Sequence, residues 1–446
     1  MALIAANHRK WWILGAMGGV LGLIVLDETV VGVALPTMRR DLGLSETGAH
    51  WIVNAYLLVL TGCAVAGGRL GDRFGHRGFF AAGMALFGLA SCAAGFAQDG
   101  TWIITARALQ GLGAAVIFPA TITMITGVFP PEQRGLAFGV QVAMGGFFIS
   151  LGPLVGGLFT DLLSWRWIFW INLPVVAAIA LIVLAAWPSP HRDKPPPGFD
   201  LPGLVAFVAG LSALVAGLMQ AAEWGWGALA TIALLAGGAL ALAAFVALER
   251  RAAEPLIRID LFERGVLNAA NLVIATGNFS KIAVIVFGAL YLQKELSMNP
   301  LDAGLALLPA VVPTLFCALL AGRLTDRFGA RGPALIGVLL HGVALLALAG
   351  AVAAKSYGLI VAPLVLWGCT LPFLAAPTRR AVMNAVEPAM RGQAGGINLT
   401  AQLLGGTIGM AVLSLLFVST QSFPIVFLAS AAVALAGLAI AWRYLK

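Results

Sequence analysis

The stretch GRLGDRFGHRG, residues 68–78, returns almost unchanged as GRLTDRFGARG at residues 322–332. Nine of the eleven positions are identical, and the two copies lie 254 residues apart. Each copy follows an apolar run that is long enough to cross a bilayer. A match of this length is a poor candidate for chance, so we expect the chain to contain two equivalent halves.

The composition is that of a membrane protein. Of 446 residues, 60% are hydrophobic and 10% are charged, whereas soluble domains carry about 25% charged residues. The apolar runs predict an all-α polytopic membrane protein with fourteen transmembrane helices. The expected spans are 11–35, 47–67, 78–97, 101–127, 135–160, 167–187, 200–221, 227–248, 265–293, 301–321, 333–354, 357–377, 392–418 and 423–443.

The basic residues are distributed unevenly between the two sides of these spans. The loops on the side of the termini hold 20 of the 27 Lys and Arg residues, the opposite loops hold 5, and 2 fall inside spans. The positive-inside rule therefore predicts a cell (inner) membrane protein with both termini in the cytoplasm. Because topology accounts for the net charge of +8, no nucleic acid partner is expected.

The repeat divides the chain into three parts. We expect an N-terminal six-helix bundle over residues 1–190, a cytoplasmic linker with two inserted helices over 191–255, and a C-terminal six-helix bundle over 256–446. Parallel repeats of this kind are typical of secondary transporters, whose substrate site lies near the midplane between the halves. The four cysteines are scattered singly, so neither a disulfide nor a metal site is expected. We expect a monomer.

Four ionisable residues lie deep inside the predicted spans: Asp27, Glu28, Arg107 and Lys281. The repeat offset places Lys281 at the position that corresponds to Asp27. At about 1.5 Å per residue, Asp27 and Arg107 lie roughly 12 Å and 9 Å below the outer helix ends. An unpaired charge in the membrane is costly. We therefore expect these two acids and two bases to share one layer and to have partners.

Each of these residues has a functional and a structural interpretation. Asp27 is either a proton-accepting, substrate-coupled carboxylate or one half of a permanent ion pair. Arg107 either tunes the proton relay or serves only as a structural partner. Lys281 is a counter-ion, a clamp for an anionic substrate or a lysine whose ammonium reaches the surface. Glu28 lies about 100° round the helix from Asp27, so the two carboxylates need not share a cavity.

Further polar residues inside spans either line the substrate cavity or join helices by hydrogen bonds. These are Asn54, Tyr56, Asn278, Asn398 and Gln402. His341 is expected to be a buried histidine bonded to a neighbour, with a proton carrier as the alternative.

Four motifs in order carry a resemblance to a known family. They are LDETVVGVALP (26–36), GRLGDRFGHR (68–77), RALQGLGAA (107–115) and GGFFISLGPLVGGL (145–158). Together they resemble the major facilitator superfamily, in particular its fourteen-helix branch of drug/proton antiporters. The chain has Gly32 where the family pattern usually has Asn, and His76 where a basic residue is common.

The resemblance implies roles for several of these residues. Arg107 matches the buried arginine that the family associates with proton transfer. The loop motif implies a cytoplasmic gate in which Asp72 pairs with basic groups, and the fifth-helix motif implies a helix that flexes at Pro153. The expected gating residues are Gly68, Asp72, Arg73, Gly152, Pro153, Gly156 and Asp326.

The expected function is proton-coupled export of lipophilic or amphiphilic compounds by alternating access. No cofactor is expected, because the proton gradient supplies the energy. The expected partners are a small-molecule substrate, protons and the bilayer. The alternative is export of an anionic amphiphile, a lipid or a natural product, with Lys281 as its anchor. An intramembrane enzyme is not expected, because the spans contain no GxSxG, HExxH or paired-aspartate signature. ATP drive is not expected, because no GxxxxGK[ST] loop occurs. A receptor without transport is not expected, because the loops are too short for a signalling domain.

Overall fold

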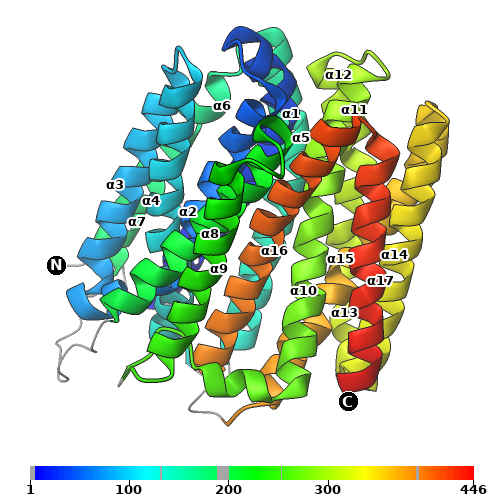
Figure 1. Ribbon diagram of the computed structural model, residues 1–446. Helices are drawn as coiled ribbons and strands as arrows, with labels where there is room; N and C mark the ends of the chain where they lie inside the picture. Colours follow the sequence, from blue (N-terminus) through cyan, green and yellow to red (C-terminus); the bar gives the residue numbers. More distant parts are fainter. Residues whose placement is uncertain (1–5, 131–132, 188–199, 253, 388–390, 446) are drawn as a thin grey trace.

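The computed structural model describes residues 6–130, 133–187, 200–252, 254–387 and 391–445; the side chains of a few residues within these ranges, Asp72 among them, are outside the description. In these ranges all regular elements are helices (Figure 1). Fourteen helical segments of the described chain are long and apolar enough to cross a membrane. The all-α class and the predicted number of spans are therefore confirmed.

The N-terminal helices form six of these segments. They are α1 (Ala6–Asp41), α2 (Glu46–Phe74), α3 (His76–Gly95), α4 (Gly100–Val128), α5 (Arg134–Leu162), and the short α6 (Trp167–Trp170) that continues into α7 (Asn172–Ala186). Two more follow as a hairpin, α8 (Leu201–Trp224) and α9 (Leu229–Glu249). Most of the predicted linker, residues 188–199, lies outside the described residues.

The C-terminal helices form the other six segments. After a 3₁₀ turn, η2 (Ile259–Glu263), one span is built from α10 (Gly265–Ile282), the π-helical η3 (Ala283–Phe287) and α11 (Gly288–Lys294). A second span joins α12 (Pro300–Ala306) to α13 (Leu308–Phe328). The remaining spans are α14 (Arg331–Ala353), α15 (Tyr357–Asn384), α16 (Arg391–Thr420) and α17 (Phe423–Tyr444).

The backbone conformation explains one glycine that both copies of the repeated motif share. Gly75 ends α2 with φ +94°, and Gly329 ends α13 with φ +80°. Residues with a Cβ rarely adopt this backbone conformation, whereas glycine reaches it at little cost. The FG pair of both copies therefore stops a helix at the same end of the molecule, called here the lower end because the C-terminus lies at the bottom of Figure 1.

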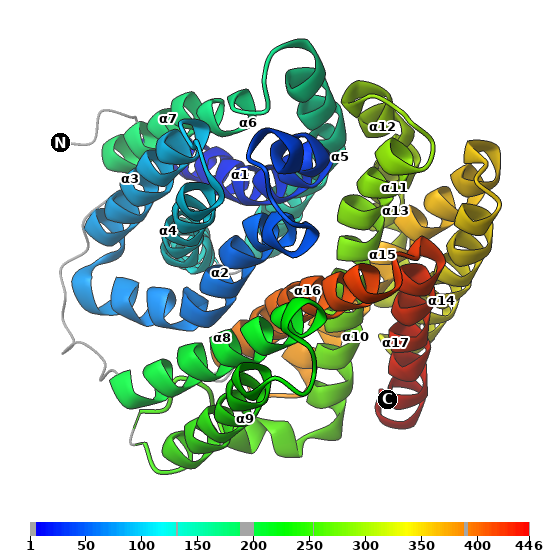
Figure 2. The ribbon, with the colours of Figure 1, turned by 45° about the horizontal axis from the view of Figure 1, so that its top comes forward.

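The helices gather into two groups with the hairpin beside them (Figure 2). Helices α1–α7 contact one another, as do α10–α17, while α8 contacts both α2 and α16. On the opposite side, α5 contacts α12 and α13. The junction between the groups therefore has two edges, one covered by the hairpin and one formed by α5 with α12 and α13.

Candidate transport site

The centre of the N-terminal group holds a buried ion pair. Arg107 of α4 and Asp27 of α1 lie 2.5 Å apart, Nη1 to Oδ2, with side chains 0% and 1% exposed. Arg107 also donates from Nε to the Ile52 carbonyl at 3.0 Å, and its guanidinium carbon lies 4.3 Å from the ring centre of Tyr56. The expected partnership of an acid in the first span with Arg107 is therefore present, within one group of helices.

Glycine in the fourth helix makes this arrangement possible. A Cβ on Gly111 would lie 2.5 Å from the Tyr56 carbonyl oxygen, closer than real Cβ atoms approach. Helices α2 and α4 can therefore pack backbone to backbone at this level. That close packing brings the Ile52 carbonyl within reach of the Arg107 guanidinium.

A second layer of amides surrounds the Asp27 carboxylate. Gln110 Nε2 donates to Oδ1 at 2.7 Å and Asn172 Nδ2 donates to the same oxygen at 3.3 Å. Both amides also bond to Ser91 Oγ, which donates to the Phe169 carbonyl. The sequence reasoning missed these three polar residues, although Gln110 lies one helical turn from Arg107, on the same helix face.

Two buried polar atoms at this site have no hydrogen-bond partner in the described part of the chain: Arg107 Nη2 and Tyr56 Oη. A buried donor without an acceptor is destabilising, typically by 1–3 kcal/mol or more for a charged group. These atoms are therefore suited to bind an additional polar group, such as a water molecule or part of a substrate.

A second ion pair connects the two groups of helices. Lys281 Nζ of α10 lies 2.8 Å from Glu28 Oε2 of α1, with side chains 13% and 10% exposed. The π-helical η3 begins two residues after Lys281. A Cβ on Gly32 would lie 3.4 Å from Val286 Cγ2 of this segment. The glycine that departs from the family pattern therefore lies where α1 packs against η3.

The other predicted polar residues divide between two places. Asn54 Nδ2 lies 2.9 Å from Met219 Sδ of the hairpin, and Asn54 Oδ1 is buried with no hydrogen-bond partner within the described ranges. In the C-terminal group, Asn278 Nδ2 donates to the Gln402 carbonyl at 2.6 Å, and Asn398 Nδ2 donates to Asn271 Oδ1 at 2.9 Å. Asn278 and Asn398 therefore join α10 to α16 in this structure.

His341 has the predicted structural environment. Its ring is fully buried, with Nε2 2.7 Å from Ser280 Oγ and Nδ1 2.7 Å from Thr370 Oγ1. Both ring nitrogens therefore have a neighbour within the C-terminal group.

A cavity of about 610 Å³ lies between the two groups near the lower end. Helices α2 and α4 contribute Gly68 and Thr123, and α16 contributes Ile397 and Thr400. The segment 254–258, called the strap below, also lines this cavity. The expected gating residue Gly68 is therefore a cavity residue in this state.

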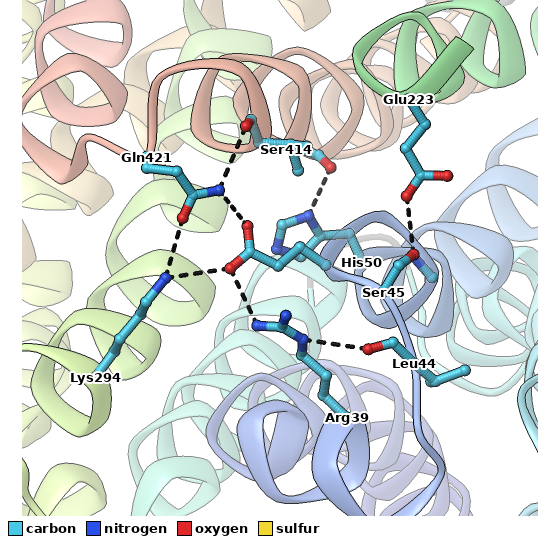
Figure 3. A network of polar contacts seen from close by, with 11 residues as sticks. Arg39, Leu44, Ser45, His50, Glu223, Lys294, Ser414 and Gln421 are labelled. Atoms are coloured by element: carbon cyan, nitrogen blue, oxygen red, sulfur yellow. Dashed lines mark hydrogen bonds and ion pairs between the residues drawn. The ribbon is translucent and has the colours of Figure 1, made fainter.

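The upper end is closed by polar contacts across the groups (Figure 3). The Glu46 carboxylate of α2 accepts hydrogen bonds from Arg39 at 3.0 Å, from Lys294 at 3.1 Å and from Gln421. Nearby, His50 Nδ1 lies 2.6 Å from Ser414 Oγ of α16. We call Arg39, Glu46, Lys294 and Gln421 the upper network; the sequence reasoning did not identify it.

The fifth-helix motif packs α5 tightly on both sides near the upper end. A Cβ on Gly156 would lie 2.9 Å from the Val30 carbonyl oxygen of α1, and one on Gly152 would overlap Thr29. On the other side, a Cβ on Gly304 of α12 would overlap the Pro153 carbonyl. These small residues therefore allow α5 to lie between α1 and the C-terminal group.

The loop motif places its charged residues at the lower end. The Asp72 side chain lies outside the described residues, and Arg73 is exposed at the end of α2. Asp326 lies 3.1 Å from Arg380 of α15. In this structure Asp326 therefore pairs within the C-terminal group.

Comparison with known proteins identifies the class. The sequence profile of the Major Facilitator Superfamily matches residues 17–248 and 269–446, and the chain belongs to that family. It is a multi-pass membrane transporter and not an enzyme.

Individual relatives are similar along most of the chain. The tetracenomycin C resistance and export protein of Streptomyces glaucescens is 34% identical over 92% of this chain and 76% of its own length. The puromycin resistance protein of Streptomyces alboniger is 36% identical over 92% of this chain and 82% of its own length. A solved bacterial homologue of the human lysosomal transporter Spinster, in an inward-facing and unoccupied conformation, shares the fold with a TM-score of 0.69 and 15% identity, over 98% of this chain and 97% of that one.

Proposed function

We propose that the protein is a proton-coupled exporter of lipophilic or amphiphilic compounds that works by alternating access. The observation that carries this proposal is the different placement of two buried ion pairs. Asp27–Arg107 lies within the N-terminal group, whereas Glu28–Lys281 connects the two groups. Protonation of Asp27 can therefore act within the N-terminal group, whereas protonation of Glu28 can act on the contact between the two groups.

Asp27 is proposed as the coupling carboxylate. Its negative charge is balanced by Arg107 and supported by two amide donors. Protonation would leave the Arg107 guanidinium buried without a counter-charge, which is strongly unfavourable. A proton at Asp27 is therefore expected to change the position of α4 relative to α1, or to draw an acceptor from the cavity toward Arg107 Nη2.

Glu28 is proposed to act on the opening of the two halves. Rocking of two bundles separates residues that contact each other across the junction. Protonation of Glu28 removes the ionic attraction to Lys281 and so favours separation. Glu28 and Lys281 are thus proposed as a lock between the halves.

The proposed orientation follows from the positive-inside rule, which places the lower end in the cytoplasm. In that orientation the cavity beside Gly68 faces the cytoplasm, while the upper network closes the outer end. The structure would then correspond to a state that accepts compounds from the cell interior. The antibiotic resistance and export functions named for the relatives support drugs or natural products as the substrate class.

A transport assay tests this proposal. The purified protein is reconstituted in liposomes with an acidic interior, and accumulation of a fluorescent lipophilic cation is measured. Gradient-dependent accumulation is expected, with loss of coupling in Asp27→Asn although the variant still inserts. Glu295→Gln is the matched control, because Glu295 forms a partly exposed ion pair with Lys355 at the upper end. Unchanged gradient-driven transport by Asp27→Asn would refute the role of Asp27.

A second candidate is export of an anionic amphiphile, and one observation favours it. When Glu28 is protonated, Lys281 remains largely buried with a positive charge that an anionic headgroup can neutralise. In this case Lys281→Met would reduce transport of an anionic dye more than that of a cationic one. The opposite preference would support the cation exporter.

A further inference from the structure

Two carboxyl groups meet at the lower end of the inserted hairpin. Asp200 caps α8, with Oδ1 accepting a hydrogen bond from Gly203 N at 2.8 Å. Glu249 ends α9, with Oε2 accepting one from Ile257 N at 3.0 Å. The second oxygen of each group, Asp200 Oδ2 and Glu249 Oε1, is buried and has no hydrogen-bond partner among the described residues. Each carboxyl group therefore uses one oxygen and leaves the other unpaired.

The two unpaired oxygens border the same small space. A Cβ placed on Gly203 would lie 2.4 Å from Asp200 Oδ2 and 2.8 Å from Glu249 Oε1. Because Gly203 has no Cβ, both carboxyl oxygens can lie against its backbone and approach each other there. Glu249 is only 3% exposed, so water cannot fully solvate it.

Electrostatics favours a single negative charge at this place. Two ionised carboxylates so close together repel each other, and a buried carboxylate oxygen without a donor is unfavourable. One proton removes the repulsion and supplies the missing donor, as in other carboxyl pairs that share a proton. We propose that Asp200 and Glu249 form a proton-binding pair that holds one proton between them.

The charged groups around the pair do not remove the need for this proton. Within the described residues, the charged groups that act on Glu249 are Asp200 of α8 and Arg69 of α2, and the Leu256 backbone of the strap also interacts with its carboxylate. Arg69 is engaged with the strap: it donates to the carbonyls of Glu254 and Pro255 and lies 4.0 Å from the Glu254 carboxylate. The cation therefore binds the strap instead of bridging Asp200 and Glu249.

The proton-binding pair controls one attachment of the strap. Arg69 holds the strap by its carbonyl groups, and Glu249 holds it by the Ile257 amide. When the pair carries its proton, Glu249 is fixed by Asp200 and can hold Ile257. When the proton leaves, repulsion displaces Glu249 and this attachment weakens. Because the strap lines the cavity between the two groups, this part of the cavity wall is held more tightly at low pH and loosens as the pH rises.

Spin-label mobility on the strap tests this inference in the full-length protein. Cys63, Cys92, Cys317 and Cys369 are replaced by alanine, and a nitroxide is attached to Leu256→Cys in detergent micelles. The ratio of mobile to immobile label is expected to rise about tenfold from acidic to alkaline pH, the change that loss of one hydrogen bond to a charged group produces. The transition should fit one proton. Asp260 is a poor alternative source of it, because hydrogen bonds from Arg258 lower the pKa of that carboxyl.

Two nearly isosteric variants locate the proton. Glu249→Gln and Asp200→Asn each provide a permanent N–H donor between the groups, so the label should stay immobile at every pH in both. Glu254→Gln is the matched control: it neutralises a strap carboxylate outside the pair and should keep the transition. A pH-independent label in the parent, a transition that persists in both variants, or a shift when choline replaces sodium at fixed pH would overturn the proposal, the last by identifying a metal cation as the ligand.

Discussion

Removing one charge of the Asp27–Arg107 pair should destabilise the protein far more than removing both. Asp27→Asn leaves an arginine that is fully buried and has no counter-charge, and Arg107→Gln leaves a carboxylate that is 1% exposed. For pairs buried this deeply, loss of one partner costs about 3–5 kcal/mol. Asp27→Asn with Arg107→Gln leaves neither charge uncompensated. The double variant should therefore be destabilised by clearly less than the sum of the single changes.

The free energy of unfolding can be measured by titrating the protein from mild detergent into SDS micelles and following tryptophan fluorescence. The expected coupling energy is on the order of 3 kcal/mol. The control is Arg258→Gln, because Arg258 and Asp260 form a pair whose side chains are 41% and 52% exposed, and such pairs contribute little. Single variants that each lose less than about 1 kcal/mol, or a double variant equal to their sum, would refute the reasoning.

Three further perturbations act on other parts of the molecule. Glu28→Gln removes the ionic contact between the groups. Spin labels at Gly43, in the turn between α1 and α2, and at Ser297, in the turn between α11 and α12, should therefore move apart in a larger fraction of molecules; an unchanged distance distribution would contradict the lock. Glu46→Gln weakens contacts with Arg39, Lys294 and Gln421 and should also open the upper end. Glu223→Gln should not, because its amide oxygen can still accept the hydrogen bond from Ser45; equal effects of the two variants would argue against Glu46 as the centre of the upper network. Gly111→Ala forces a Cβ against the Tyr56 carbonyl and should lower the free energy of unfolding, measured by SDS titration, by about 1–3 kcal/mol. Gly350→Ala, with open space around its Cβ, should leave it unchanged. Similar values for both variants would show that α4 can move away from α2.

The fold was largely predictable because each span satisfies its own backbone hydrogen bonds in the membrane. Local apolar content therefore identifies a helix without knowledge of its neighbours. The predicted ends of the helices were less accurate. Helix α1 continues to Asp41, beyond the predicted end at residue 35, and α15 continues to Asn384, beyond the predicted end at residue 377. Charged and polar residues can extend a helix beyond the apolar core into the membrane–water interface. Hydropathy does not identify this part of the helix.

The site was predictable only as a set of residues. The presence of Asp27, Glu28, Arg107 and Lys281 within spans follows from the sequence, and the cost of buried charge implies partners. Which acid pairs with which base depends on how α1 packs against α4 and α10, and that packing is a long-range property. The π-helical turn after Lys281 and the hydrogen bonds of Asn172 depend on the same packing.

The inserted hairpin has a consequence for motion. Helix α8 contacts α2 through Trp51–Gln220 and Asn54–Met219, and it also packs against α16 of the other group. If the two groups rotate relative to each other, α8 cannot keep both sets of contacts unchanged. It must then slide along either α2 or α16. In the part of the chain that the structure describes, α5 contacts α12 and α13 directly, with no inserted helix between them. Rotation would therefore be unequal at the two edges, with slip along α8 and hinge-like opening on the side of α5.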